Sequence, residues 1–278
     1  MIILSKKPFF TVIILFYLNY KMNPIYELNP PKILNSNRID IALLNQELNK
    51  FLNRAKIISN FTKYIHITDS VLGMPRFSSF HAAQIIKNNL TNTNLNISCS
   101  VRTRDRNMNS IIQMVTDAVI LKISSILFIH GDKPAFEESE KASSLSTPTD
   151  VVKLLTSIGF DKLIDLDLSI PNKISNHKVF NKKVNSKPHR FITQSINSIQ
   201  EIRDLKDLIV PNHIELVPCI MVPSIKNERA ASMIGLDWSE YQDNFLEFLR
   251  EVHTETDQIL ITSPNSFDDG IEVLKKIG

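Results

Sequence analysis

The chain has 278 residues, of which 43% are hydrophobic and 22% are charged, and its formal net charge is +3 at pH 7. This composition is typical of a folded globular protein and excludes an intrinsically disordered chain. A net charge this small also argues against a nucleic-acid partner, because such proteins gather Lys and Arg on one face. Cys99 and Cys219 are too few for a disulfide framework or a cysteine metal site, which indicates a protein of the reducing cytoplasm.

The first 21 residues form an apolar extension ahead of the patterned part of the chain. Its apolar segment, residues 9–20, is too short to span a bilayer, which takes about 20 residues. No small-residue cleavage site of a signal peptide follows it. Because Met22 directly precedes the first patterned segment, we interpret residues 1–21 as an upstream extension from a mis-assigned start; a membrane anchor is the alternative.

From Met22 onward, short β-type segments alternate with amphipathic helical segments. Runs of β-branched and apolar residues predict buried parallel strands, and apolar residues spaced three and four apart predict helices. The strands are predicted at residues 24–27, 64–68, 95–101, 126–129, 163–168, 190–193, 214–218 and 258–262. The helices are predicted at residues 41–52, 80–86, 111–119, 149–155, 175–184, 196–205, 226–250 (long enough for two) and 267–277.

Eight β-then-α units of this size are what a (β/α)8 barrel requires. We therefore predict that residues 22–278 form a single α/β domain with the TIM-barrel fold. An open doubly wound sheet is the alternative, but no G-x-G-x-x-G motif follows the first strand. The chain has only six glycines, so a glycine loop that cradles phosphate is not expected.

The carboxyl ends of barrel strands share one mouth, where ligands bind. The fourth predicted strand stops at His130, Gly131 and Asp132. Gly131 has no Cβ and would let the backbone approach a ligand, beside the carboxylate of Asp132. A turn with polar surface residues is the alternative for this segment. The other strand ends contribute polar residues to the same mouth: Glu27, Thr68, Arg102, Arg104, Asp105, Thr193, Gln194 and Asn265.

Glu27 is the candidate general acid at this mouth. Its neighbours in the sequence are apolar and include two prolines. A carboxyl group in a partly dry pocket has a raised pKa and can donate a proton near neutral pH. A solvated loop acid is the alternative for Glu27. No metal site is predicted, because the histidines do not show metal-ligand spacing.

Five short motifs, in chain order, resemble the methylenetetrahydrofolate reductase family. YELNPPK at residues 26–32 resembles the family's (F/Y)E-x-x-P-P-(K/R) start, and RDRN at residues 104–107 resembles the end of its C-R-D-R-N stretch. GDKP at residues 131–134 is similar to R-G-D-x-P, and RFITQ at residues 190–194 matches R-x-I-T-Q. Residues 218–223 resemble the family's P-G-I-(L/M)-P stretch.

The resemblance implies a barrel that binds FAD and reduces 5,10-methylenetetrahydrofolate, or a related methylene-tetrahydropterin, to the 5-methyl form in one-carbon metabolism. NAD(P)H or another donor, including an electron-donor protein, would supply the electrons. Glu27 matches the acid that protonates the ring nitrogen as the five-membered ring opens, and Asp132 matches an acid near the flavin and the pterin. The remaining implied contacts are Thr68, Ser100, His130, Gly131, Asp132 and Lys183 for the flavin, and Gln194, Asp132 and Asn265 for the substrate.

The chain departs from the family pattern at several positions. Ser100 stands where the family has a flavin-contacting histidine, and His130 where it has an arginine. Ser266 follows Asn265 where an arginine would bind the folate tail. A second hypothesis therefore stays open, namely a non-redox pterin-binding barrel or a subunit of a methyl-transfer or reductase complex. A homo-oligomer is compatible with both hypotheses.

Overall fold

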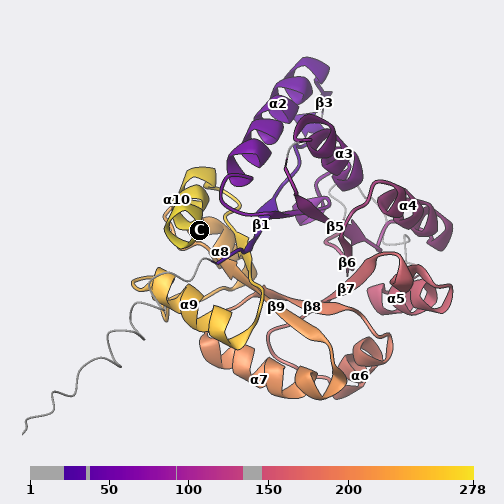
Figure 1. Ribbon diagram of the computed structural model, residues 1–278, viewed down its shortest axis with the longest axis vertical. Helices are drawn as coiled ribbons and strands as arrows, with labels where there is room; N and C mark the ends of the chain where they lie inside the picture. Colours follow the sequence, from indigo (N-terminus) through magenta and orange to yellow (C-terminus); the bar gives the residue numbers. More distant parts are fainter. Residues whose placement is uncertain (1–21, 36–37, 92, 134–145) are drawn as a thin grey trace, which may run out of the picture.

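The parallel strands of the chain close into a barrel. The computed structural model describes residues 22–35, 38–91, 93–133 and 146–278. The first barrel strand pairs with the second on one side and with the last on the other, and the rest follow in chain order around the ring (Figure 1). The barrel strands are β1 (Ile25–Leu28), β4 (Tyr64–Ile67), β5 (Asn96–Arg102), β6 (Ser125–Ile129), β7 (Asp165–Ile170), β8 (Arg190–Ser195), β9 (Glu215–Met221) and β10 (Leu260–Thr262).

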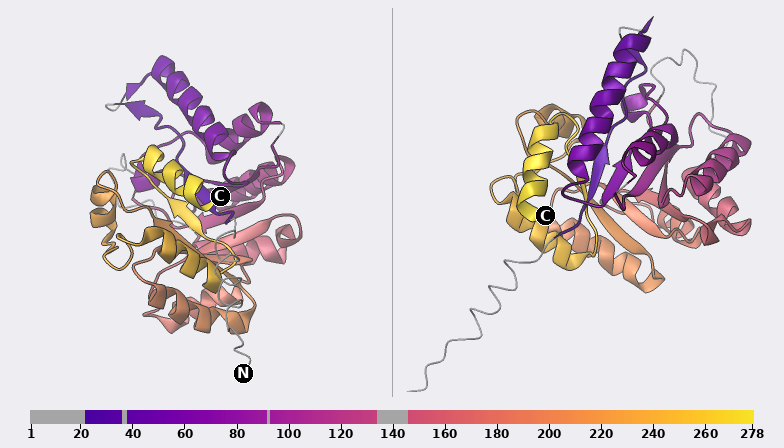
Figure 2. Two further views of the ribbon diagram at one scale, coloured as in Figure 1. Left: turned by 60° about the vertical axis from the view of Figure 1, so that its left-hand side comes forward. Right: turned by 45° about the horizontal axis from the view of Figure 1, so that its top comes forward.

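Helices surround the barrel on the outside (Figure 2). They are α2 (Ile41–Ile58), α3 (Ser79–Asn89), α4 (Met108–Ile120), α5 (Pro148–Ser157), α6 (His177–Asn185), α7 (Ile199–Ile209), α8 (Glu228–Ile234), α9 (Phe245–Glu255) and α10 (Phe267–Ile277). A small antiparallel hairpin, β2 (Leu34–Asn35) and β3 (Arg38–Ile39), precedes α2. The closed ring of alternating strands and helices confirms the predicted single-domain (β/α)8 fold.

Several element boundaries differ from the prediction by a few residues, and one hairpin was not predicted. β7 begins at Asp165 rather than at residue 163, because a 3-10 turn at Phe160–Lys162 precedes it. α7 begins at Ile199 rather than at residue 196, because the Ser198 side chain caps the helix by accepting a hydrogen bond from the Glu201 amide. The β2–β3 hairpin was not predicted, since two-residue strands are too short to show a periodic pattern.

The apolar core has two parts. The larger part packs the outer faces of the strands against the surrounding helices. The smaller part fills the inside of the barrel and consists of inward-facing residues of β1, β6, β8, β9 and β10: Ile25, Leu127, Ile192, Val217, Cys219 and Leu260. A filled interior is typical of this fold, so ligands have access only at the rim.

One ion pair lies within the barrel wall. Arg190, the first residue of the RFITQ motif, donates from Nε and Nη2 to the two carboxylate oxygens of Asp167 at 3.1 and 2.8 Å. Asp167 is fully buried. A bidentate pair of this kind holds β7 and β8 in register, so Arg190 has a structural role at the opposite end of β8 from the mouth.

Two features of the sequence fall outside the described residues: the apolar extension, residues 1–21, and Pro134 of the GDKP motif. Within residues 22–35, 38–91, 93–133 and 146–278, no helix has the length and apolar character needed to cross a bilayer.

Candidate functional site at the barrel mouth

Glu27 lies near the C-terminal end of β1, at the mouth of the barrel. Its Oε1 atom accepts a hydrogen bond of 2.7 Å from the hydroxyl of Thr262, the last residue of β10. Burial raises the pKa of the Glu27 carboxyl group, while the Thr262 hydrogen bond and the positive charge of Arg76 act to lower it. The expected environment of Glu27, with a pKa raised by desolvation, is therefore present.

The loop that follows β1 contacts two residues from the segment after β4, Thr68 and Arg76. Asn29 Oδ1 accepts a hydrogen bond of 2.6 Å from the hydroxyl of Thr68, which follows β4. Arg76 Nη1 donates to the carbonyl oxygen of Pro30 at 2.7 Å. The Nε atom of Arg76 is buried and has no hydrogen-bond partner among the described residues. We call Glu27, Asn29, Thr68, Arg76 and Thr262 the Glu27 side of the mouth.

A buried arginine occupies the neighbouring part of the mouth. Arg102, the last residue of β5, is only 1% exposed. Its guanidinium donates from Nη1 to the Ser70 carbonyl at 3.1 Å and from Nη2 to the Asp132 carbonyl at 2.8 Å. It also lies 3.4 Å from the carboxylate of Asp105. Arg102 therefore ties together the three loops that follow β4, β5 and β6.

Asp69 extends this set of contacts. Its Oδ2 atom accepts hydrogen bonds from the Arg102 amide at 3.0 Å and from Arg106 Nη1 at 2.6 Å. Asn107 caps α4 by accepting from the Ser110 amide at 2.9 Å. The RDRN motif thus supplies an ion pair and a helix cap. We call Asp69, Arg102, Asp105, Arg106 and the Asp132 main chain the Arg102 network.

Gly131 and Asp132 contact this network. Gly131 has φ +85°, and a Cβ atom there would lie 2.6 Å from Arg102 Nε. We predicted that the absence of a Cβ at Gly131 would let a ligand approach the main chain, but the Arg102 side chain fills that space. The exposed Asp132 side chain accepts a hydrogen bond of 3.0 Å from the Leu72 amide.

Ser100 lies deeper in the barrel than a mouth residue. Its hydroxyl is 2.8 Å from His66 Nε2, and Ser98 is 2.8 Å from His66 Nδ1. Burial, together with the charge of Arg190, lowers the pKa of His66 to about 3, so the ring is neutral at physiological pH. Both ring nitrogens have a serine partner, and the Ser100 hydroxyl is correspondingly engaged.

The other predicted contacts, Lys183, His130, Gln194 and Asn265, lie on helix α6 and near the ends of β6, β8 and β10. Lys183 on α6 donates from Nζ to the carbonyl oxygen of Ser169 in β7, and burial lowers the pKa of this lysine. His130 and Gln194 are exposed, and Gln194 sits where the pairing of β8 with β9 shifts register. The exposed Asn265 donates from its main-chain N–H to Asn227 Oδ1 at 3.0 Å.

These contacts bear on whether the predicted residues fit a flavin. His130 is exposed at the mouth, whereas the Thr68 hydroxyl and the Lys183 ammonium group already donate to Asn29 Oδ1 and to the Ser169 carbonyl oxygen. The Ser100 hydroxyl contacts His66, and the Asp132 carboxylate accepts from the Leu72 amide. The space beside Gly131 is filled by Arg102. In this conformation the six residues do not fit a flavin as one set.

Sequence reasoning missed Thr262, Asn29 and Arg76. Thr262 ends a predicted strand, so the rule that picked out Thr68 could also have found it. Asn29 and Arg76 lie in loops without a periodic pattern. Only the folded chain brings Asn29 to Thr68 and Arg76 near Glu27. Within the described ranges, no group of three His, Cys, Asp or Glu side chains could hold a metal ion.

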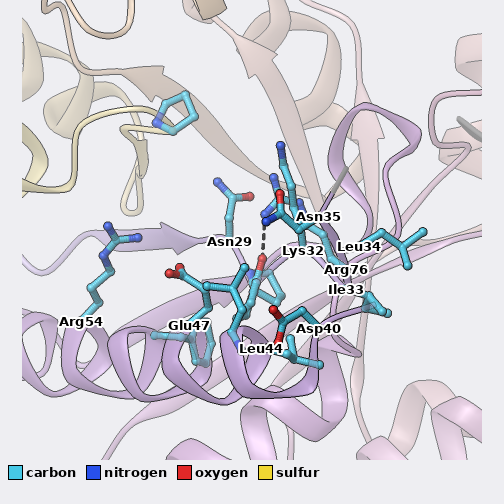
Figure 3. A pocket seen from close by; sticks show the side chains of 15 residues that line it. Asn29, Lys32, Ile33, Leu34, Asn35, Asp40, Leu44, Glu47, Arg54 and Arg76 are labelled. Atoms are coloured by element: carbon cyan, nitrogen blue, oxygen red, sulfur yellow. Dashed lines mark hydrogen bonds between the residues drawn. The ribbon is translucent and has the colours of Figure 1, made fainter. Parts of the chain in front are cut away.

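A cavity of about 350 Å3 adjoins the Glu27 side of the mouth. It lies between the loop that follows β1 and one face of α2, and Asn29 and Arg76 belong to both the cavity and the mouth (Figure 3). A wider surface groove of about 480 Å3 lies outside the barrel along residues of α9 and α10. Only the first of these two shares residues with the Glu27 side of the mouth.

No family model and no curated protein matches the sequence. Among solved structures, the chain is similar to a thermostable aldo-keto reductase in complex with the inhibitor epalrestat, with a TM-score of 0.53, 11% identity and coverage of 90% of this chain and 88% of that one. It is similar to orotidine 5'-monophosphate decarboxylase from Methanocaldococcus jannaschii complexed with the inhibitor BMP, with a TM-score of 0.52, 7% identity and coverage of 93% and 99%.

A third similar structure is a chain of the tryptophan synthase a2b2 complex from Pyrococcus furiosus, with a TM-score of 0.53, 8% identity and coverage of 93% and 97%. All three similar proteins are enzymes, and one of them is an oxidoreductase. At these identities the likeness establishes the fold alone, because barrels of this type carry many unrelated reactions. The comparisons therefore place this chain among (β/α)8 barrels.

Proposed function

We propose that the protein reduces the methylene group of 5,10-methylenetetrahydrofolate, or of a related methylene-tetrahydropterin, with Glu27 as the general acid. The observation that carries this proposal is the environment of Glu27: a carboxyl group with a raised pKa, at the C-terminal end of a barrel strand and held by Thr262. The motif resemblance supports the same role.

The chemistry requires one proton at a defined atom. Reduction adds a hydride to the methylene carbon while one of its two C–N bonds breaks, and the nitrogen that leaves must take up a proton. A carboxyl group whose pKa is raised keeps its proton to higher pH and can donate it to the leaving nitrogen. The hydrogen bond from Thr262 holds one carboxyl oxygen, which leaves the other oxygen available to carry the proton to the substrate.

The resemblance also predicts the source of the hydride. We propose FAD as the carrier, with NAD(P)H or an electron-donor protein as the reductant. Because Ser100, Gly131 and Asp132 are engaged within the protein, this part of the proposal has a separate test. Purified protein that shows the visible absorption of a flavin, or acquires it on titration with FAD, supports the carrier; protein that binds no FAD contradicts it.

The test of the acid is Glu27→Gln, assayed anaerobically for conversion of the methylene substrate to the methyl product. We expect turnover to fall about 10²- to 10⁴-fold, as is usual when a general acid is removed. Substrate binding, measured by calorimetry, should persist, because glutamine keeps the size and hydrogen-bonding capacity of the side chain. Glu215→Gln is the matched control, since Glu215 is an exposed glutamate at the opposite end of the barrel. An unchanged rate in Glu27→Gln would overturn the assignment.

A second candidate function follows from the engaged flavin residues. We propose as the alternative that the barrel binds a tetrahydropterin without reducing it, as a subunit of a methyl-transfer or reductase complex. The separating measurement is titration of the protein with the 5-methyl carrier. Tight binding without FAD binding and without turnover supports the alternative, whereas turnover by the purified chain excludes it.

A further inference from the structure

The cavity beside the Glu27 side of the mouth shares two residues, Asn29 and Arg76, with the candidate active site. Asn29, which lines the cavity, accepts the hydrogen bond from Thr68, and Arg76, which also lines it, influences the pKa of Glu27. Pro264, which follows β10, completes the wall on the same side. A substrate whose reactive ring lies at Glu27 can therefore extend past Arg76 into this cavity.

The two acidic side chains of the cavity are already compensated. Asp40 caps α2, and its Oδ1 atom accepts a hydrogen bond of 2.9 Å from the Leu43 amide. Glu47 pairs with Lys50 at 2.6 Å on the same helix. Neither acid requires a ligand cation for its charge.

The three cationic side chains of the cavity are not paired in this way, although the charge of Arg76 interacts with Glu27 over a longer distance. In the part of the chain that the structure describes, Lys32, Arg54 and Arg76 form no ion pair with an acid. Arg54 lies over the ring of Phe267, 5.1 Å from its centroid. Arg76 donates to a carbonyl oxygen through Nη1, while its buried Nε has no hydrogen-bond partner.

The arrangement of these cations suits an extended anion. Figure 3 shows Lys32 and Arg76 close together on one side of the cavity, and Arg54 farther along α2. Ammonium and guanidinium groups recognise carboxylates and phosphates through charge-assisted hydrogen bonds. Two separate positive positions along one cavity fit a chain that carries more than one negative charge. A volume of about 350 Å3 is enough for part of a cofactor-sized ligand.

We propose that this cavity binds the anionic tail of the tetrahydropterin whose ring lies at Glu27. The inference rests on the proposed function for the identity of the ring. The shared chemistry is a flexible tail with two or more negative charges, supplied either by carboxylates of a glutamate chain or by a phosphate group. Lys32 and Arg76 bind the part nearer to the mouth, and Arg54 binds the distal part.

The test uses tail fragments without a pterin ring, so that it is separate from catalysis. The full-length protein is titrated by calorimetry with p-aminobenzoyl-triglutamate in one arm and with ribose 5-phosphate in the other. We expect one of the two fragments to bind, and the binding to weaken as salt is added. The fragment that binds identifies the tail as carboxylate or phosphate.

Charge variants then locate the site. Lys32→Gln and Arg54→Gln should each weaken binding of that fragment about tenfold, the usual effect of removing one charged hydrogen-bond partner. Lys56→Gln is the matched control, because Lys56 is an exposed cation on α2 outside the cavity. It should leave the affinity unchanged.

The outcomes separate this inference from the proposed function. A protein that reduces the methylene substrate but binds neither fragment, or whose Lys32→Gln and Arg54→Gln variants behave like Lys56→Gln, overturns the tail site alone. A protein that binds a fragment through Lys32 and Arg54 but binds no tetrahydropterin supports an anion site and overturns the proposed function.

Discussion

Glu27 and Asp132 each lie at the C-terminal end of a barrel strand, but their carboxyl groups have different surroundings. Glu27 is partly buried, has one hydrogen bond from a threonine hydroxyl, and has its pKa raised by desolvation. Asp132 is exposed and accepts a hydrogen bond from a main-chain amide. Its main chain belongs to the Arg102 network, in which the guanidinium contacts are made within the protein.

The difference separates a part of the mouth that stabilises the fold from a part that is available for chemistry. In the Arg102 network, buried charge is balanced by carboxylates and carbonyl oxygens, which is how folded proteins retain an arginine in their interior. The unpartnered buried Nε atom does not distinguish the two sides, because Arg76 and Arg102 both have one within the described residues. On the Glu27 side, a carboxyl group is desolvated and its pKa is raised. Groups that cost folding free energy in this way are found more often at functional sites.

The largest expected loss of stability comes from breaking the Arg102 network. Arg102→Met removes the buried guanidinium and leaves the Ser70 and Asp132 carbonyls without their donor. We expect the free energy of unfolding to fall by about 3 kcal/mol, since each unsatisfied buried group costs about 1–3 kcal/mol. Urea denaturation measures the loss, with Arg229→Met, at an exposed arginine of α8, as the control. A loss no larger than that of the control would contradict the role of Arg102.

A pair of glycine variants tests the same network more finely. Gly131 and Gly159 both have positive φ, +85° and +92°, but a Cβ atom meets Arg102 only at Gly131, whereas nothing lies within 4 Å at Gly159. Both alanine variants lose about 1 kcal/mol to backbone strain. Gly131→Ala should lose about 1–2 kcal/mol more through displacement of Arg102. Equal losses in the two variants would mean that Arg102 moves aside freely.

The Glu27 side is tested by the pH dependence of stability. Because burial raises the folded-state pKa of Glu27, its stabilising contribution is complete at acidic pH and is lost as pH rises through that raised pKa. Glu27→Gln does not ionise, so this variant should be more stable than the wild type at alkaline pH and similar to it at acidic pH. Thermal unfolding across pH measures both. A variant that is less stable than wild type at alkaline pH would show that the ionised carboxylate is favoured in the fold.

The smallest effect is expected for Asp132→Asn. Asparagine keeps an oxygen that can accept from the Leu72 amide, and the side chain is exposed, so the loss of stability should be below about 1 kcal/mol. We also expect turnover to fall less than in Glu27→Gln, in the same anaerobic assay. Equal losses of turnover would assign Asp132 the catalytic role that the motif resemblance implies.

The sequence was sufficient to predict the fold, and it also offered Glu27 as a candidate site residue. Repeated apolar segments with period two and then 3.6 predict strands and helices in alternation, and this order leaves few ways to close the sheet. Glu27 was selected as a candidate because it ends a predicted strand and has apolar neighbours. Its raised pKa followed from those neighbours, since desolvation depends mainly on local apolar surface.

The partners of these residues were decided by tertiary structure. Arg102 was predicted only as a polar strand end, yet the fold buries it against Gly131 and the carbonyl oxygens of two other loops. The contact between Glu27 and Thr262 joins residues from opposite ends of the sequence. No pattern within one segment encodes such contacts.

The alternation of eight strand and helix segments predicted a barrel, with the polar residues of the strand ends at one rim. The sequence thus determined the architecture and the location of the mouth, because hydrophobic periodicity is a local property. Only the closed barrel decided that Gly131 accommodates an arginine side chain and that Lys32, Arg54 and Arg76 face one cavity next to Glu27. Side-chain contacts between distant segments depend on packing in three dimensions, and packing exists only once the barrel has closed.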